Sequence, residues 1–146
     1  MHFKKMFSLI KNTLFLLAFM ALPAQAKCPS GLDFMCSFLK DFQKEITPNL
    51  PMQLSDNLYL RQVVAIDNTL HMYVLLSYDR TFLINEYATY GLGIEDAKLA
   101  LKQFATNYNC SNNLTSKMIK AGGVITSHYQ FNNGEELVTF SVSSCN

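Results

Sequence analysis

Histidine is the side chain best suited to acid–base chemistry near neutral pH, and residues 27–146 contain two, His71 and His128. Each lies in a stretch that alternates apolar and polar residues, and the alternation predicts that both sit on the outer face of a sheet. Two histidines beside a cation, here Arg61, form the smallest set for acid–base cleavage of a phosphodiester, as in small disulfide-rich ribonucleases. A small secreted hydrolase is therefore our alternative hypothesis. We favour the reading that both are ordinary surface histidines.

Other catalytic and metal-binding patterns are missing from the sequence. It contains no G-x-S-x-G, H-E-x-x-H, P-loop or calcium-loop motif. The Gly91/Gly93 pair lacks the preceding strand and the third glycine of a nucleotide-binding loop. We therefore expect a protein that is not an enzyme and that holds no metal or cofactor.

The four cysteines are even in number, which in a small exported domain indicates two disulfides: Cys28, Cys36, Cys110 and Cys145. A zinc site built from all four is disfavoured because no C-x-x-C pair occurs. Three pairings are possible. We favour Cys28–Cys36, which are close in sequence, and Cys110–Cys145, which bracket a compact C-terminal unit.

Tyrosine is unusually frequent, and all seven tyrosines lie within residues 27–146. Tyrosine combines a large contact area with a polar tip and is enriched in recognition surfaces. The tyrosines could instead fill the seams between helices and sheet. The candidate partner-binding residues are four outer-face side chains of the first predicted hairpin, with two tyrosines of a glycine-flanked segment at their rim: Tyr59, Arg61, His71 and Tyr73, then Tyr87 and Tyr90.

Residues 1–26 have the pattern of a cleaved secretory signal. Three lysines precede an apolar run at residues 14–22, and Ala24-Gln25-Ala26 supplies the small residues that signal peptidase accepts. The run is shorter than the about 20 residues that a membrane-spanning helix needs. We expect cleavage after Ala26, no stable membrane insertion of the product, and a location in a bacterial periplasm or otherwise outside the cell.

Removing this signal changes the charge of the chain. All 146 residues carry 12 basic and 11 acidic side chains, a formal +1; residues 27–146, without three lysines, carry nine and eleven, a formal −2. Because nucleic-acid binding depends on a concentrated basic face, we expect no nucleic-acid partner. The remaining 120 residues fit a single disulfide-bonded domain.

Helices are predicted at the N-terminus and in the middle of the predicted mature chain. The first has an apolar stripe at three- and four-residue steps and ends before Pro48: Phe34, Met35, Phe38, Leu39, Phe42 and Ile46. This stripe could dock on a membrane or a partner, but we expect it to pack on the domain's own sheet. Residues 80–109 are predicted to be helical, with a break at 91–93, and a short helix is expected from 111 or 112 to 120.

Two β-hairpins are predicted. In the first, Asp67-Asn68-Thr69 is expected to form a three-residue turn that pairs Ile66 with Leu70 and Val64 with Met72. These apolar residues would face the core, and Val63 would lie on the outer face. In the second, Asn133-Gly134 is the preferred two-residue turn. It would pair Tyr129–Val138, Ser127–Phe140 and Ile125–Val142 on a buried face, and Gln130–Leu137, His128–Thr139 and Thr126–Ser141 on a polar face, with Glu136 opposite Phe131.

The predicted fold class is α+β. Its centre would be a four-stranded antiparallel sheet from the two hairpins, about 57–78 and 124–144, with an N-terminal helix and a helical insert packed on it.

The function expected is that of an exported, non-enzymatic domain that binds another exported or envelope protein. Accessory factors of secretion or envelope assembly and inhibitor or immunity proteins both fit, and carriage of a small apolar ligand between the sheet and the first helix is a further option.

Overall fold

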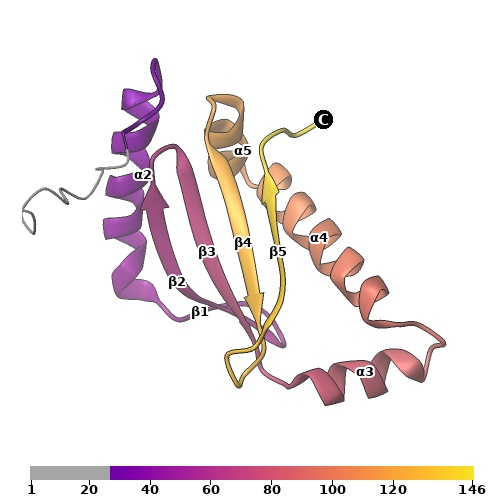
Figure 1. The fold of residues 1–146 in the computed structure, drawn as a ribbon. Coiled ribbons are helices and arrows are strands. Elements are labelled where there is room, and N and C mark those ends of the chain that lie inside the picture. Colours follow the sequence, from indigo (N-terminus) through magenta and orange to yellow (C-terminus); the bar gives the residue numbers. More distant parts are fainter. Residues whose placement is uncertain (1–26) are drawn as a thin grey trace, which may run out of the picture.

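The computed structural model describes residues 27–146, so the predicted export signal and its cleavage site lie outside the described residues. The helices and strands follow one another as Figure 1 shows. In chain order they are α2 (Asp33–Ile46), the 3₁₀ turn η1 (Thr47–Asn49), β1 (Met52–Ser55), β2 (Leu58–Ile66), β3 (Thr69–Leu76), α3 (Arg80–Ala88), α4 (Ile94–Ser111), α5 (Asn113–Lys120), β4 (Val124–Gln130) and β5 (Glu136–Val142).

The α+β class is confirmed, but the sheet has five strands in the order β1-β2-β3-β4-β5 and is mixed. The prediction of a four-stranded antiparallel sheet is wrong because it missed β1 and because β3 and β4 pair in parallel, from Thr69 opposite Val124 to Leu75 opposite Gln130. Two hairpins laid side by side can meet in either direction. The helical insert sets the relative direction of β3 and β4. It carries the chain back along the sheet before β4 begins, and parallel neighbouring strands require such a crossover.

The first hairpin has a different register from the one predicted. Asp67 adopts a left-handed backbone at φ 52°, so the turn needs only two residues and Ile66 pairs with Thr69. A bulge at Arg61 then separates the pair at Leu60 from the pair at Gln62. Because a shift of one residue exchanges the two faces, Val63 is 3% exposed and in the core. For the same reason Ile66, predicted to be buried, is 45% exposed.

The second hairpin follows its predicted pairs from Ile125–Val142 to Tyr129–Val138, on both faces. Its turn is one residue longer than predicted. Gly134 N donates to Phe131 O, and Phe131 N donates to Glu135 O. Gly134 has φ 86°, the left-handed conformation that closes a three-residue loop. The resulting bulge pairs Gln130 with Glu136, so the predicted partner Leu137 is buried instead of lying on a polar face.

The predicted helices are present. The first spans Asp33–Ile46, and the insert contains α3, α4 and α5, with the break at residues 89–93. Asp79 caps α3 by accepting a hydrogen bond from Phe82 N at 2.8 Å. Asn112 caps α5 by accepting from Leu114 N and Thr115 N. None of the helices in residues 27–146 has the length and apolarity that crossing a membrane requires.

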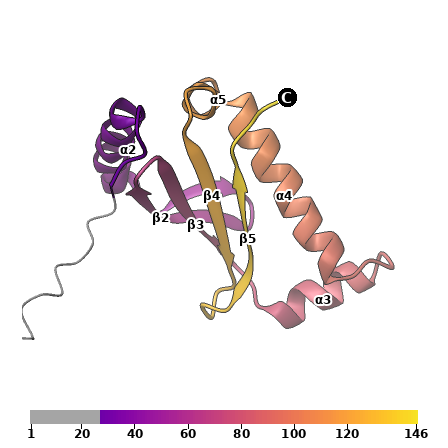
Figure 2. The same ribbon diagram turned by 45° about the horizontal axis from the view of Figure 1, so that its top comes forward.

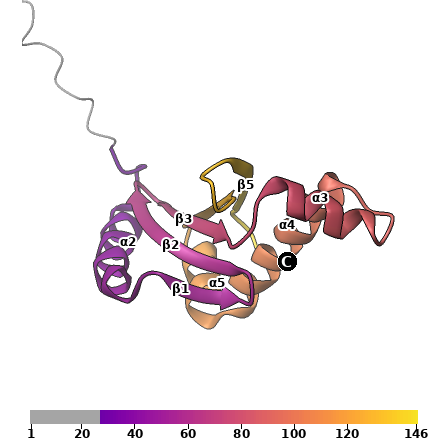
Figure 3. The same ribbon diagram turned by 90° about the horizontal axis from the view of Figure 1, so that it is seen from below.

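Helices α2, α4 and α5 cover one face of the sheet. Residues of α2, of the α4–α5 junction and of the sheet's core side line one common pocket, so these elements share a face. Figure 2 shows α2 beside β2 and α4 beside β5, and Figure 3 gives the view from below. Gln43 links α2 to the sheet, because its Oε1 accepts a hydrogen bond from Ala65 N at 2.7 Å. Within residues 27–146 no helix packs on the opposite face of the sheet. This face is toward the viewer in Figure 1, where β4 passes in front of α5.

The two disulfides follow the pairing favoured from the sequence. Cys28–Cys36 joins the segment before α2 to the first turns of that helix. Cys110–Cys145 joins the end of α4 to the segment after β5. Disulfides of this kind are typical of proteins in an oxidising compartment outside the cytoplasm.

Candidate functional site

Two surfaces of the molecule could bind a partner, and they lie on opposite faces of the sheet. We call the first the histidine face: Tyr59, Arg61, His71, Tyr73 and His128. We call the second the groove, which runs between α2 and the α4–α5 pair: Phe34, Met35, Phe38 and Phe42 on one wall, and Phe104, Tyr108, Leu114, Lys117 and Met118 on the other.

The structure brings the two histidines together. His71 Nδ1 and His128 Nε2 are 2.9 Å apart across the β3–β4 seam. The other ring nitrogen of His128, Nδ1, lies 3.0 Å from Thr139 Oγ1. Tyr73 stacks on the His128 ring with a centroid separation of 4.5 Å. The two rings are therefore held in a chain of side-chain contacts that crosses three strands.

The surroundings of His128 lower its pKa and so favour the neutral imidazole. Partial burial lowers the pKa of its imidazole, neighbouring His71 lowers it further, and the Glu136 carboxylate partly opposes both effects. The rings contact each other directly, with no space between them for a phosphodiester. General acid and general base must reach different atoms of one substrate, so this geometry does not favour the hydrolase hypothesis.

The remaining residues of the histidine face are spread along the first hairpin. Tyr59 is half-buried opposite Leu75, and Arg61 is exposed at the bulge. Tyr87 and Tyr90 do not rim this face. They lie on α3 and the turn after it, beyond the end of the sheet and on the side of α4, away from β2 (Figures 1 and 3). Tyr90 is 73% exposed, whereas Tyr87 packs partly against the core.

The groove has apolar walls, from α2 on one side and from α4 and α5 on the other. At its α5 end a pocket of about 290 Å³ lies between Phe34, Met35 and Phe38 of α2 and Leu114 and Met118 of α5. A second pocket of about 170 Å³ continues beneath it to the sheet. Its floor consists of side chains of β1, β2 and β3, namely Met52, Leu60, Val63, Leu70 and Met72.

Large apolar side chains of the groove are open to solvent. Phe34 is 80% exposed, Leu114 44% and Tyr108 38%. The Phe34 ring lies 6.3 Å from that of Phe38, so the two form a continuous aromatic edge along α2. Burying a large apolar side chain is worth about 1.5–3 kcal/mol relative to leaving it in water. Exposed apolar surface is often found at interaction sites, so the groove is a candidate for one.

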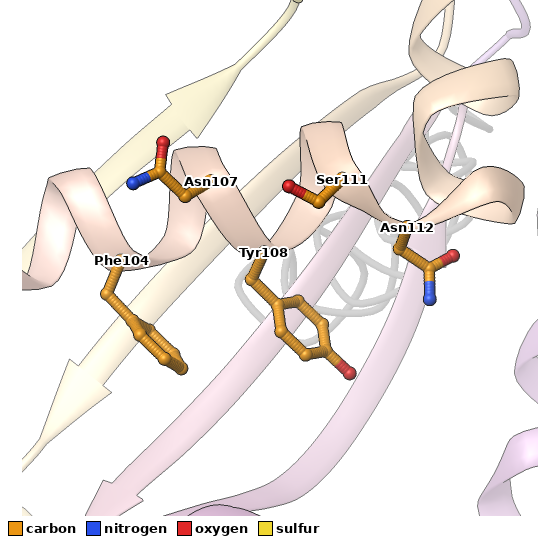
Figure 4. A pocket seen from close by; sticks show the side chains of 5 residues that line it. All are labelled: Phe104, Asn107, Tyr108, Ser111 and Asn112. Atoms are coloured by element: carbon orange, nitrogen blue, oxygen red, sulfur yellow. The ribbon is translucent and has the colours of Figure 1, made fainter.

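The α4 side of the groove extends this surface. Figure 4 shows Phe104 and Tyr108 projecting side by side from one side of α4, away from Asn107 and Ser111. Their ring centroids are 6.0 Å apart. Together with Asn107, Ser111 and Asn112 they line an open hollow of about 450 Å³. One long, shallow recess therefore follows α2 on one side and α4 and α5 on the other.

Charged residues stand at the rim of the groove. Asp41 and Glu45 of α2 line a hollow with Phe38, Phe42 and Leu114, and Lys117 borders the pocket at the α5 end. The α2 rim is thus acidic, apart from Lys44, which pairs with Asp41 at 3.5 Å.

The apolar stripe of α2 was predicted to pack on the domain's own sheet, so the groove was not predicted. Met35 and Leu39 do pack in the core, with exposures of 4% and 0%. The sequence nevertheless contains a pattern that indicates an exposed apolar surface on α2. Phe34, Phe38 and Phe42 recur at four-residue steps beside the Met35–Leu39 row, which makes the apolar stripe wider than one sheet face can cover.

Residues 27–146 contain no group of three or more histidine, cysteine, aspartate or glutamate side chains placed to hold a metal ion.

Comparison with known proteins identifies the fold. No model of a known protein family matches the chain, and no curated protein matches its sequence. Among solved structures, the pilotin EpsS of the Vibrio vulnificus type 2 secretion system superposes with a TM-score of 0.61 at 9% sequence identity, covering 76% of this chain and 89% of its own.

Two further structures show the same likeness. The type II secretion system pilotin AspS of Vibrio cholerae has a TM-score of 0.58 at 13% identity, covering 75% of this chain and 89% of its own. A protein of Pseudomonas aeruginosa described as secreted also has a TM-score of 0.58 at 13% identity, covering 78% of this chain and 94% of its own. The chain therefore has an α+β fold similar to that of two secretion-system pilotins and a third bacterial protein.

Proposed function

We propose that this protein is an exported, non-enzymatic accessory factor of a secretion or envelope-assembly machine. In this proposal it binds an amphipathic helix of an envelope protein in the groove. The observation that carries the proposal is the open apolar recess between α2 and α5, edged by Phe34 and Leu114. The fold likeness to two pilotins supports it, because pilotins are components of a secretion system.

The dimensions of the groove suit a helix. Its α2 wall is 14 residues long, which corresponds to about 21 Å. A helix of similar length laid along it would place apolar residues at i, i+3, i+4 and i+7 into the recess, the usual pattern of helix-in-groove recognition. The acidic rim at Asp41 and Glu45 favours lysine or arginine on the flank of that partner helix.

The shape of the groove argues against carriage of a small apolar molecule. Sites for drug-sized ligands are typically enclosed and about 300–1,000 Å³ in volume. The more deeply placed pocket here is about 170 Å³, and the larger hollows lie open at the surface. A long macromolecular segment matches this surface better than a compact ligand.

An inhibitor or immunity role would also use exposed partner-binding surfaces, and the histidine face is the competing candidate for any such contact. On that face Tyr59, His71 and Tyr73 are already half-buried by their neighbours on the sheet. In the groove Phe34, Leu114 and Tyr108 are exposed, and this difference favours the groove as the main contact surface.

Site-specific photo-crosslinking in the native host envelope tests the proposal. A benzoylphenylalanine residue is placed at Phe34 or Leu114 in the groove, and at Tyr73 on the histidine face as the matched control. We expect the same protein to be captured from both groove positions and not from position 73. Peptide mapping should then locate the crosslink in a segment with helical apolar periodicity. Capture only from position 73, or a crosslinked segment without that periodicity, would overturn the proposal.

A further inference from the structure

The two edge strands of the sheet differ in how well they are protected against pairing with a further strand. An edge strand presents a row of unpaired N–H and C=O groups, and proteins usually protect it by shortness, proline, charge or a bulge. Strand β1 has three such features. It contains four residues, it follows Pro51, and its register is irregular between Gln53 and Ser55. The β1 edge is therefore poorly suited to further pairing.

Strand β5, at the other edge, has little such protection. It contains seven residues, and from Val138 to Val142 it pairs regularly with β4. The stretch Leu137–Val142 contains no charged residue and no proline, and it is rich in the β-branched and aromatic residues that favour strands. Within residues 27–146 no strand lies beyond β5, and no loop or helix backbone group hydrogen-bonds to Leu137–Val142. This edge can therefore accept another strand.

Both ends of β5 are held in place. Before the strand, Arg80 Nε donates to Glu135 Oε1 at 2.6 Å. After the strand, the Cys110–Cys145 disulfide joins the chain to the end of α4. A strand that is already ordered loses little conformational entropy when it binds a partner.

The residues of β5 are complementary to a second copy of the strand running in the opposite direction. About a two-fold axis at Thr139, each of the seven residues has a partner, and Thr139 faces its own copy. Val138 faces Phe140 of the other copy, and this pair occurs twice. Aromatic residues beside β-branched ones, and paired threonines, are stabilising cross-strand neighbours. The one charged residue, Glu136, faces Val142, so the two copies of Glu136 lie at opposite ends and do not repel each other.

Burial along β5 also indicates a missing neighbour. Val138 and Phe140 lie on the same face of the sheet as the core residues Tyr129 and Val142, yet they are only half-buried. Because β5 is the last strand, no neighbouring strand covers these side chains on the side away from β4. A second copy of β5 would supply that neighbour for both residues.

We propose that two copies of this protein associate through β5, in an antiparallel pairing centred on Thr139 that joins two five-stranded sheets into one. The partner is a second copy of this chain because the strand pairs with itself over its full length without opposing like charges. One strand from each copy makes a small interface, so the dimer should dissociate on dilution. The pairing uses a sheet edge and not the groove, so it does not rest on the proposed function.

Sedimentation equilibrium of the protein purified after full-length expression tests the proposal. Over a range from about 1 µM to about 1 mM we expect conversion from one chain to two. Larger species should be absent, because the pairing consumes the β5 edge and leaves only the protected β1 edge. A chain that stays monomeric over the whole range, or that forms an open series of larger species, would overturn the proposal.

Charge variants at the two-fold axis test the register. Thr139 is exposed, so the fold should tolerate a change there. Thr139→Lys and Thr139→Glu each place like charges opposite each other and should raise the concentration of half-association by about 5–10-fold. An equimolar mixture of the two should associate within about threefold of the parent, because opposite charges then face each other.

Thr139→Val is the matched control, since it keeps an uncharged β-branched residue. It should associate within about threefold of the parent. All three variants lose the contact of the Thr139 hydroxyl with His128 Nδ1, so the comparison among them isolates charge. A lysine variant that associates like the parent, or a mixture that associates no better than its components, would contradict the pairing.

Hydrogen exchange of the unmodified protein gives a measurement that needs no variant. As the concentration rises through the association range, amides in Val138–Val142 should become more protected and those of β1 should not change. Increased protection in β1 alone would refute the assignment. So would a monomer whose β5 amides become protected only when envelope extract is added, because the edge would then bind an extended segment of another protein.

Discussion

The two faces of the sheet differ in how far their aromatic side chains are exposed to solvent. On the histidine face the rings pack against one another, as Tyr73 does on His128, and their contacts are completed within the chain. In the groove the rings also pair along each helix, as Phe34 does with Phe38, but Phe34 remains 80% exposed. Aromatic content alone therefore does not identify a binding surface. The two faces differ in the fraction of large apolar side chain that is left exposed, and mutations on each face can test whether this difference matters for binding.

The largest effect should come from the core beneath the groove. Leu39 is on the same helix as Phe34 but is fully buried. Leu39→Ala should lower the free energy of unfolding by about 2–5 kcal/mol, because it removes buried methyl groups and leaves a cavity. Phe34→Ala should change it by less than about 0.5 kcal/mol, as expected for an exposed position. Urea denaturation measures both, and similar losses would show that Phe34 contributes to the core.

Binding should show the reverse order. Phe34→Asp places a charge where the partner helix would bury an apolar ring, so crosslinking from position 114 should fall by about 10-fold or more. Tyr73→Ala should leave that yield within about twofold. A drop for Tyr73→Ala with no drop for Phe34→Asp would exchange the roles that we assign to the two faces.

The wall of the groove depends on the cap of α5. Asn112 Oδ1 accepts from Leu114 N at 2.9 Å and from Thr115 N at 3.2 Å. Asn112→Ala should cost about 1 kcal/mol of stability through loss of this cap. Asn112→Asp retains an acceptor and serves as the control, with a loss well below that of alanine. Thermal unfolding monitored by circular dichroism gives both values.

The smallest expected effect concerns pH and the histidine face. Because the folded state lowers the pKa of His128 below its ordinary value, the unfolded chain binds more protons between the two pKa values. Stability should therefore rise with pH through this window, be complete above the ordinary histidine pKa near 6.5, and be lost as the pH falls below it. Unfolding free energies of the parent and of His128→Gln should converge at acid pH. A parallel pH dependence of the two proteins would contradict the assignment.

Much of the fold could be predicted because local patterns decide it. The spacing of Phe38, Phe42 and Ile46 predicted α2, the alternation around Tyr129 predicted β4, and the cysteine positions favoured the observed disulfides. The errors arose where a single backbone conformation outweighs a pattern. A left-handed Asp67 and a bulge at Arg61 moved Val63 and Ile66 to the opposite faces, and residue types do not determine either feature.

The candidate site was harder to predict because it depends on the relation between elements that are distant in sequence. Phe34 in α2 and Leu114 in α5 are far apart in the sequence, and only the packed structure shows that they line the same pocket. The sequence predicted only that His71 and His128 lie on the same face of the sheet. Their direct contact follows from the parallel pairing of β3 and β4, which the sequence analysis did not foresee.

That parallel pairing also has a consequence for how the chain folds. Each hairpin closes a loop of a few residues, whereas Leu70 and Ile125, neighbours in the sheet, are 55 positions apart. The entropic cost of closing a loop rises by about 0.6 kcal/mol for each doubling of its length. The central seam should therefore form after both hairpins and limit the folding rate. Until it forms, the edges of β3 and β4 stay unpaired, so the folding chain would depend on rapid docking of its two hairpins to avoid aggregation.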